Sequence, residues 1–141
     1  MPSIFEISAS ALTAERIRMQ TIANNLANIE TGRAGVDAQG NAVPYRRKRV
    51  HFEVGIPGQS RTEGVSVARI EEDPAPFRLV HDPSNPLAVK SGPEAGYVRM
   101  PNVNPTMEMV DLIAASRAYE ANITAMEAAR SMATSAIRIL A

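Results

Sequence analysis

The chain has 141 residues, the usual size of one domain, and its 15 basic and 15 acidic residues give a formal net charge of zero. This balance argues against a general role in binding nucleic acid or anionic membranes, because such binding uses a broad positive field. The sequence has no cysteine, which excludes disulfide bonds and thiol catalysis, and with three Tyr, three Phe and no Trp it predicts a thin core.

The start of the chain, "MPSIFEISAS", lacks the basic stretch and apolar run of a secretory signal. No apolar run approaches the roughly 20 residues that span a bilayer. We therefore expect no membrane span and, if the protein leaves the cytoplasm, export without a cleaved signal peptide.

A long helix is predicted near the N-terminus, from about residue 4 to residue 30. Ser3 and Glu6 have the spacing of a capping box, and Gly32 suits the left-handed residue that ends many helices. At 1.5 Å per residue this helix is roughly 40 Å long. Its apolar seam, at heptad spacing, consists of Phe5, Leu12, Met19, Ile22, Leu26 and Ile29.

Three asparagines, Asn24, Asn25 and Asn28, are concentrated near the end of this predicted helix. Asparagine is a poor residue for a helix interior because its amide competes for backbone groups. On a helical wheel the three lie beside the apolar seam, so we interpret them as polar contacts to a neighbouring subunit that fix register. A fraying helix end is the alternative.

The middle of the chain, residues 33–104, predicts short strands joined by extended loops. Val50, Phe52 and Val54 alternate with polar residues, as do Val65 and Val67, and "GN" marks a turn. Seven of the ten prolines lie between Pro44 and Pro93, which favours loops over long strands.

Two charged runs stand out in this middle region. A basic run of Arg46, Arg47, Lys48 and Arg49 could contact phosphate, but the neutral chain lacks the wider basic field, so a strand whose arginines face water or an acidic neighbour is favoured. Our specific hypothesis is a contact with acidic residues of an adjacent subunit. The acidic run Glu71, Glu72 and Asp73 could bind a cation, but a loop ending at Pro74 is the simpler interpretation.

A second long helix is predicted from about Pro105 to Leu140, roughly 50 Å long. Asn104 supplies a capping amide, and proline is tolerated in the first turn. The seam consists of Met109, Leu112, Tyr119, Ile123, Met126, Ile137 and Leu140, with Asn122 as a candidate polar contact. Alanines on several other faces would let further helices approach closely.

The predicted fold is mainly α with a small β or extended insertion. We expect the terminal segments, 1–32 and 105–141, to pair as one discontinuous coiled-coil domain around the middle region 33–104. Apolar stripes at helical spacing usually mean ordinary core. Here the length of both helices beside so small a middle favours packing among subunits, because a monomer would leave much of the seam exposed.

Nothing in the sequence points to catalysis, a metal or a cofactor. His51 and His81 lie on different expected strands with no His-Glu-x-x-His arrangement, so structural histidines are favoured over a metal site. The sequence has no Gly-x-Ser-x-Gly elbow, P-loop or Gly-x-Gly-x-x-Gly. We therefore expect a protein that is not an enzyme.

Both ends of the chain resemble the signatures of bacterial flagellar rod and hook proteins. The N-terminal stretch is "SALTAERIRMQTIANNLANIETG" and the C-terminal one is "GYVRMPNVNPTMEMVDLIAASRAYEANITAMEAARSM". The C-terminal stretch is most similar to proximal members of the basal-body rod family, with the motif residues Pro101, Asn102, Val103, Asn104, Glu108 and Arg117.

The resemblance implies a structural subunit that assembles helically into the periplasm-crossing rod around the export channel. It implies export by the flagellar type III system, and as partners other rod proteins, further copies of the chain, the rod–MS-ring junction protein and the export-gate proteins. The alternative from another class is a non-flagellar coiled-coil adaptor with a β insertion; an enzyme is a distant third.

Overall fold

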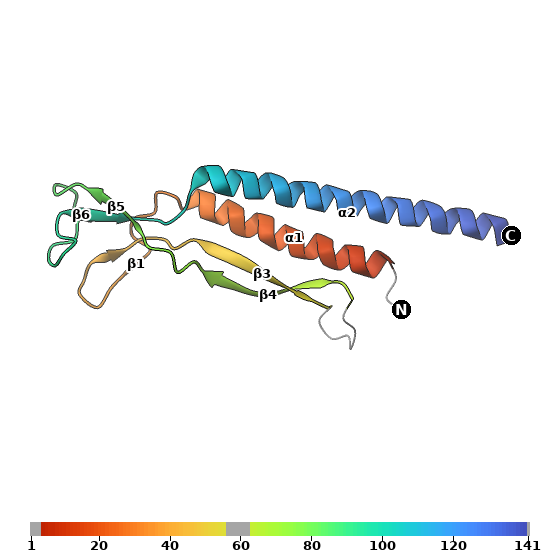
Figure 1. The fold of residues 1–141 in the computed structure, drawn as a ribbon, viewed down its shortest axis with the longest axis horizontal. Helices are drawn as coiled ribbons and strands as arrows, with labels where there is room; N and C mark the ends of the chain where they lie inside the picture. Colours follow the sequence, from red (N-terminus) through yellow and green to blue (C-terminus); the bar gives the residue numbers. More distant parts are fainter. Residues whose placement is uncertain (1–3, 56–62, 141) are drawn as a thin grey trace. The chain divides into compact units, whose positions relative to one another are not determined.

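The computed structural model describes residues 4–55 and 63–140, with side chains as far as residue 138 (Figure 1). Within these residues two long helices bracket six short strands, which confirms a mainly helical chain with a small strand insertion. The elements are α1 (Ile4–Ala27), β1 (Gly35–Val36), β2 (Ala42–Val43), β3 (Lys48–Val54), β4 (Val65–Glu72), β5 (Arg78–His81), β6 (Tyr97–Met100) and α2 (Pro105–Leu140).

Helix α2 has its predicted bounds and α1 ends three residues early. The Asn104 Oδ1 atom accepts hydrogen bonds from the backbone N–H of Thr106 (3.0 Å) and Met107 (3.3 Å), so the predicted cap of α2 is formed. Residues 28–30 form a turn after α1 instead of a further helical turn. Of the predicted capping box at the start of α1, Ser3 lies outside the described residues.

The strands form three separate two-stranded sheets, β1 with β2, β3 with β4, and β5 with β6 (Figure 1). The first and third pairs are antiparallel, and β5 and β6 pair Arg78 with Met100 and His81 with Tyr97. The alternation in residues 50–54 and 65–67 thus lies on strands, as predicted.

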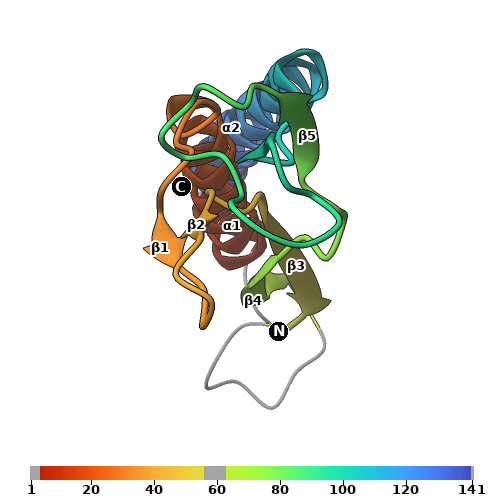
Figure 2. The ribbon, with the colours of Figure 1, turned by 90° about the vertical axis from the view of Figure 1, so that its left-hand side faces the viewer.

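The chain divides into two compact units, each containing part of both helices. Unit 1 consists of the described residues of Met1–Gln20, Val50–Ile70 and Asp111–Ala141, and unit 2 of Thr21–Arg49 and Glu71–Val110. Within each unit the stretches of α1 and α2 lie side by side and run in opposite directions (Figure 1, Figure 2). Neither helix, as far as it is described, has an apolar stretch long enough to cross a bilayer.

The cores of the two units differ in kind. The most buried helix residues of unit 1 are small: Ser8, Ala14, Ala115 and Ala129. There, the Ser10 Oγ atom of α1 accepts a hydrogen bond from the backbone N–H of Val65 in β4 (3.1 Å). Unit 2 buries larger and more polar residues: Thr21, Ile22, Asn25, Pro44, Tyr45, Val89, Val98 and Glu108.

The turn between β1 and β2 depends on Asp37 and Gly40. The Asp37 carboxylate accepts hydrogen bonds from the backbone N–H groups of Gln39 (3.0 Å) and Asn41 (2.8 Å). Gly40 has φ of 81°, a left-handed conformation that glycine adopts without strain. The predicted glycine-asparagine turn is therefore present.

The Gly40→Ala variant should lower the free energy of unfolding by about 1 kcal/mol, because a Cβ atom disfavours positive φ. Open space surrounds the place that this Cβ would occupy, so crowding does not contribute. Gly35→Ala is the matched control in the same hairpin, with equally open space and no positive φ, and should change stability little. Urea unfolding of both variants measures the difference; equal losses would contradict the conformational explanation.

Candidate functional site

A buried polar cluster in unit 2 joins the end of α1, the segment leading into β3 and the first turn of α2. We call this cluster, consisting of Asn25, Tyr45, Arg47, Asp73, Asn102 and Glu108, the polar junction. Its centre is buried: the exposed fraction is 1% for Asn25 and 0% for Glu108. Buried polar groups of this kind cost free energy unless they are hydrogen-bonded.

The Asn25 amide makes all four hydrogen bonds available to it. Its Nδ2 atom donates to the Lys48 carbonyl and to the Glu108 Oε2 atom, both at 2.9 Å. Its Oδ1 atom accepts from the Tyr45 hydroxyl and from the Lys48 backbone N–H, also at 2.9 Å. One side chain of α1 therefore holds α2 and the beginning of β3 together.

The Glu108 carboxylate uses both oxygens within the junction. Oε2 accepts from Asn25, and Oε1 forms an ion pair with the Arg47 guanidinium. Glu108 lies in the first turn of α2, where the helix dipole favours a negative charge. Burial raises the pKa of the Tyr45 hydroxyl, with nearby Glu108 and Glu72 adding to the effect, so this group stays a donor at neutral pH.

Asp73 and Asn102 complete the junction on the other side of Arg47. The Asp73 carboxylate pairs with the guanidinium groups of Arg47 (3.2 Å) and Arg49 (3.6 Å). The Asn102 side chain accepts from the Arg47 backbone N–H (2.8 Å) and donates to the carbonyls of Asp73 (3.2 Å) and Ala75 (3.1 Å).

The predicted basic run thus finds acidic partners within the chain. Arg47 and Arg49 contact Asp73, whereas Arg46 donates to the Asp73 and Ala75 carbonyls and lies 4.1 Å from the Phe77 ring centroid. The Lys48 ammonium lies 5.9 Å from the ring of Tyr45. Of the acidic run, the Glu72 side chain is exposed and that of Glu71 is half-buried. A contact of these residues with an adjacent subunit stays a prediction.

The four predicted polar contacts occupy different environments. Asn25 is buried with partners in its own chain, whereas Asn24 is exposed. Asn28 follows the end of α1 and its Nδ2 atom donates to the backbone carbonyl and side chain of Asn24, both at 2.9 Å. The half-buried Asn122 donates to the Ala118 carbonyl one turn earlier in α2 (2.8 Å).

The predicted seam residues are buried to different degrees. Ile22 is buried, and the half-buried members are Leu12, Met19, Leu26, Ile29, Leu112, Tyr119 and Met126. The exposed members are Phe5, Met109, Ile123 and Ile137, and the side chain of Leu140 lies outside the described set. Burial along α2 follows a neighbouring heptad series instead, through Glu108, Ala115, Asn122 and Ala129.

The family-motif residues lie around the junction, apart from Arg117. Pro101 and Glu108 are buried, Asn102 and Val103 are half-buried, and Asn104 caps α2. Arg117 is exposed on α2. Tyr45, which contacts Asn25, was missed as a site residue because an aromatic residue beside a basic run carries no signal for an amide 20 residues away.

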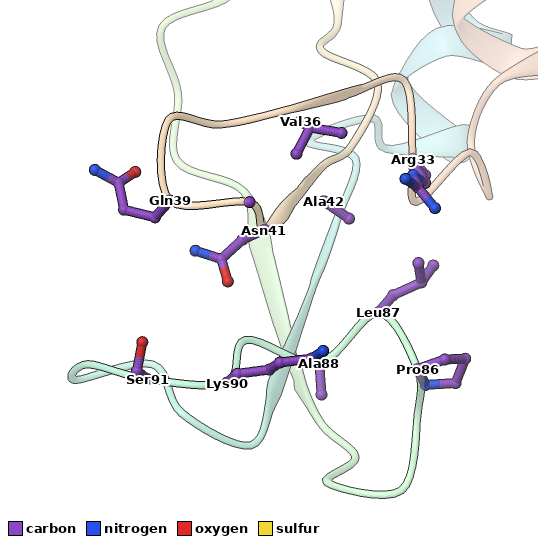
Figure 3. A pocket seen from close by; sticks show the side chains of 11 residues that line it. Arg33, Val36, Gln39, Asn41, Ala42, Pro86, Leu87, Ala88, Lys90 and Ser91 are labelled. Carbon is purple, nitrogen blue, oxygen red and sulfur yellow. The ribbon is translucent and has the colours of Figure 1, made fainter.

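A polar hollow of about 380 Å³ lies between the β1–β2 hairpin and the loop 86–91, both in unit 2 (Figure 3). Its charged lining residues are Arg33 and Lys90, with the side chains of Gln39, Asn41 and Ser91 nearby. Among the described residues that line it there is no carboxylate and no histidine, and it includes no member of the polar junction.

No group of three His, Cys, Asp or Glu residues within the described segments is placed to hold a metal ion. His51 lies on β3 and His81 on β5. The His81 ring meets the Tyr97 ring edge-on, with centroids 5.0 Å apart. The hydrogen bonds and ion pairs described for the polar junction join residues of unit 2 to one another.

Comparison with known proteins shows to which class of protein the chain belongs. Residues 5–34 match the family described as "Flagella basal body rod protein", and residues 94–139 match "Flagellar basal body rod FlgEFG protein C-terminal". The two matched segments contain most of α1 and α2, including Asn25 and Glu108. The chain is therefore of the flagellar basal-body rod class.

Three relatives, each named "Flagellar basal-body rod protein FlgC", narrow this assignment. That of Borreliella burgdorferi is 40% identical, with 98% of this chain and 96% of the relative covered. That of Bacillus subtilis is 44% identical, with 94% and 93% covered, and that of Yersinia enterocolitica is 46% identical, with 92% and 90% covered. The chain belongs to the FlgC family of flagellar basal-body rod proteins.

Removing the Glu108 carboxylate should destabilise the chain strongly. In Glu108→Ala, an amide N–H of Asn25 and the Arg47 guanidinium lose a buried partner, so the free energy of unfolding should fall by about 3 kcal/mol. Glu120→Ala, an exposed carboxylate on the same helix, is the matched control and should change it by less than about 0.5 kcal/mol. Urea denaturation followed by circular dichroism measures the free energy of unfolding of both variants. A similar decrease in both would contradict a special contribution of the polar junction to stability.

Asp73 should make stability depend on pH. The backbone N–H of Ala75 lowers its pKa below the usual 3.8, opposed by burial and helped by Arg47 and Arg49. A lowered pKa in the folded state stabilises above the ordinary value, and this contribution is lost as pH falls through the lowered one. We expect lower stability at about pH 3 than at about pH 6, with a smaller difference in Asp73→Asn. Asp37 and Asp82 also have lowered pKa values, so the variant should keep part of the slope; an unchanged slope would contradict the assignment.

Proposed function

We propose that this chain is a structural subunit of the flagellar basal-body rod and has no enzymatic activity. The observation that carries the proposal is 40–46% identity to three FlgC rod proteins over at least 92% of the chain. In its finer form, the chain assembles helically with other rod proteins and further copies of itself into a periplasm-crossing drive shaft around the export channel. The rod–MS-ring junction protein and the export-gate proteins are its proposed neighbours.

The exposed apolar surface of α2 supports an assembling protein. Met107, Met109, Val110 and Ile113 are each at least 55% exposed within two turns of the helix. Large apolar side chains gathered on one exposed surface mark interaction sites more often than free monomer surface. Covering this surface with neighbouring helices would stabilise the assembly by the hydrophobic effect.

The second supporting feature is the small size of the residues farther along α2. Ala114, Ala121, Ala125 and Ala128 are exposed, and small side chains let helix backbones approach closely. We propose that the segments 1–32 and 105–141 form a discontinuous coiled-coil domain that packs against neighbouring subunits, with the middle region 33–104 outside. Asn24, Asn28 and Asn122 are the asparagines left for contacts at the edges of that packing.

Assembly would then complete the ordering of the helix ends. Residues 131–138 at the end of α2 are all exposed, and a helix with no packed face is marginal in water. In this proposal the chain passes through the flagellar type III apparatus without a cleaved signal peptide, and the terminal helices become fully ordered on their neighbours.

Complementation of a strain lacking this gene tests the function. The parent chain should restore rods and motility, whereas a Met109→Glu/Ile113→Glu variant should fail to enter isolated basal bodies, because two charges would be buried at the subunit interface. Since both side chains are exposed in the single chain, its unfolding free energy should change by less than about 1 kcal/mol.

Gln39→Glu/Ser91→Glu, which adds the same two negative charges at exposed positions of the β1–β2 hairpin and the loop 86–91, is the control and should restore motility. Normal rods in the strain without the gene would overturn the proposed function. Full rod incorporation of the Met109→Glu/Ile113→Glu variant would overturn the assignment of this surface as the interface.

A further inference from the structure

The helix packing of unit 1 has only small residues at its most buried positions, Ser8, Ala14, Ala115 and Ala129. The larger apolar residues of the same helix stretches are only half-buried: Leu12, Met19, Leu112, Tyr119 and Met126. A half-buried apolar side chain loses only part of its contact area when a helix slides, whereas a buried polar group loses its hydrogen bonds altogether. Apolar packing in this unit therefore discriminates between registers less sharply than a buried polar pair does.

Unit 2 has the opposite property. Asn25 and Glu108 are among the largest fully buried side chains of the described chain, and every polar atom of both has a partner. A slip of one turn would displace Glu108 by about 5.4 Å, well beyond hydrogen-bonding distance from Asn25. The carboxylate and the amide would then be buried without partners, which is costly.

We propose that the Asn25–Glu108 pair sets the axial register of α2 against α1, with Arg47 holding it in place. Arg47 acts from a third segment: its guanidinium holds Glu108, while its backbone N–H donates to Asn102 at 2.8 Å. Each helix is continuous, α1 from Ile4 to Ala27 and α2 from Pro105 to Leu140, so a slip of one helix at the pair requires that helix to slide as a whole. The pair acts mainly by excluding other registers, as a buried polar residue does in a coiled coil.

The register determines how much of α2 is left for other contacts. Helix α2 has 36 residues and α1 has 24, and all side chains of residues 131–138 are exposed. A shift of α2 by one turn would change the length of this free end by about 5.4 Å. This consequence rests on the proposed rod function, whereas the register itself does not.

Spin labels can measure the register in the full-length chain. The sequence has no cysteine, so Gln20→Cys on α1 and Ala125→Cys on α2, both exposed and in unit 1, would carry the only two labels; in the proposed register they are offset along the helix axes, so a slip changes their separation directly. Pulsed electron paramagnetic resonance of this parent should give one narrow distance distribution.

In the same background, Asn25→Leu/Glu108→Leu should broaden this distribution or shift it by about 5 Å, the rise of one turn. A narrow distribution at the parent distance would overturn the proposal. Asn24→Leu/Glu127→Leu, two exposed residues on the same helices, is the matched control and should keep the parent distribution. Equal broadening in this control would also overturn the proposal.

If the double leucine variant fails to fold, Asn25→Leu/Arg47→Met/Glu108→Leu gives the same test. Replacing a whole buried ionic group with apolar residues is often neutral or stabilising, so this variant should keep its helices by circular dichroism. Its distance distribution should still broaden or shift; the parent distribution would overturn the proposal. Because the measurement uses the purified chain, its outcome is independent of whether the protein enters rods.

Discussion

A single buried amide connects the parts of unit 2. Asn25 binds the α2 carboxylate, the β3 backbone and the Tyr45 hydroxyl with all of its donors and acceptors. A buried amide is tolerated only when it is fully hydrogen-bonded. If one partner is lost, a polar group stays buried without a hydrogen bond, which raises the free energy of the folded state. The end of α1, the segment before β3 and the start of α2 are thereby made mutually dependent.

This dependence spans long distances in the sequence. Asn25 and Glu108 are separated by 83 residues and Arg47 and Glu108 by 61, whereas the helices form from contacts within a few residues. The local elements are therefore specified by propensity and capping, and their arrangement by a few polar contacts. An alanine-rich helix with a shallow surface needs such a device more than one with a large interlocking core does.

This difference between local signals and contacts far apart in the sequence explains what could be predicted from the sequence. The bounds of α2 followed from Asn104, Pro105 and the heptad spacing, and the β1–β2 turn from Gly40 and Asn41, because these signals are local. The buried face of α2 could not be predicted in this way, because the apolar spacing points to Met109 whereas the structure buries Glu108. Glutamate is usually a surface residue and is buried only when it is paired, and the pairing of Glu108 with Asn25 and Arg47 is not visible in the sequence.

Asn25 was singled out from the sequence as a contact to a neighbouring subunit, whereas its amide has all its hydrogen-bond partners within its own chain. Its low helix propensity pointed to a specific contact, and the structure supplies that contact within the chain. In the proposed rod assembly, the exposed apolar residues of α2 have a different role. Met107, Met109, Val110 and Ile113 would provide non-directional attraction, which favours association but specifies alignment poorly. In that proposal, directional polar bonds align the two helices at the junction within each chain, the exposed apolar surface binds neighbouring subunits, and those neighbours complete the ordering of the helix ends.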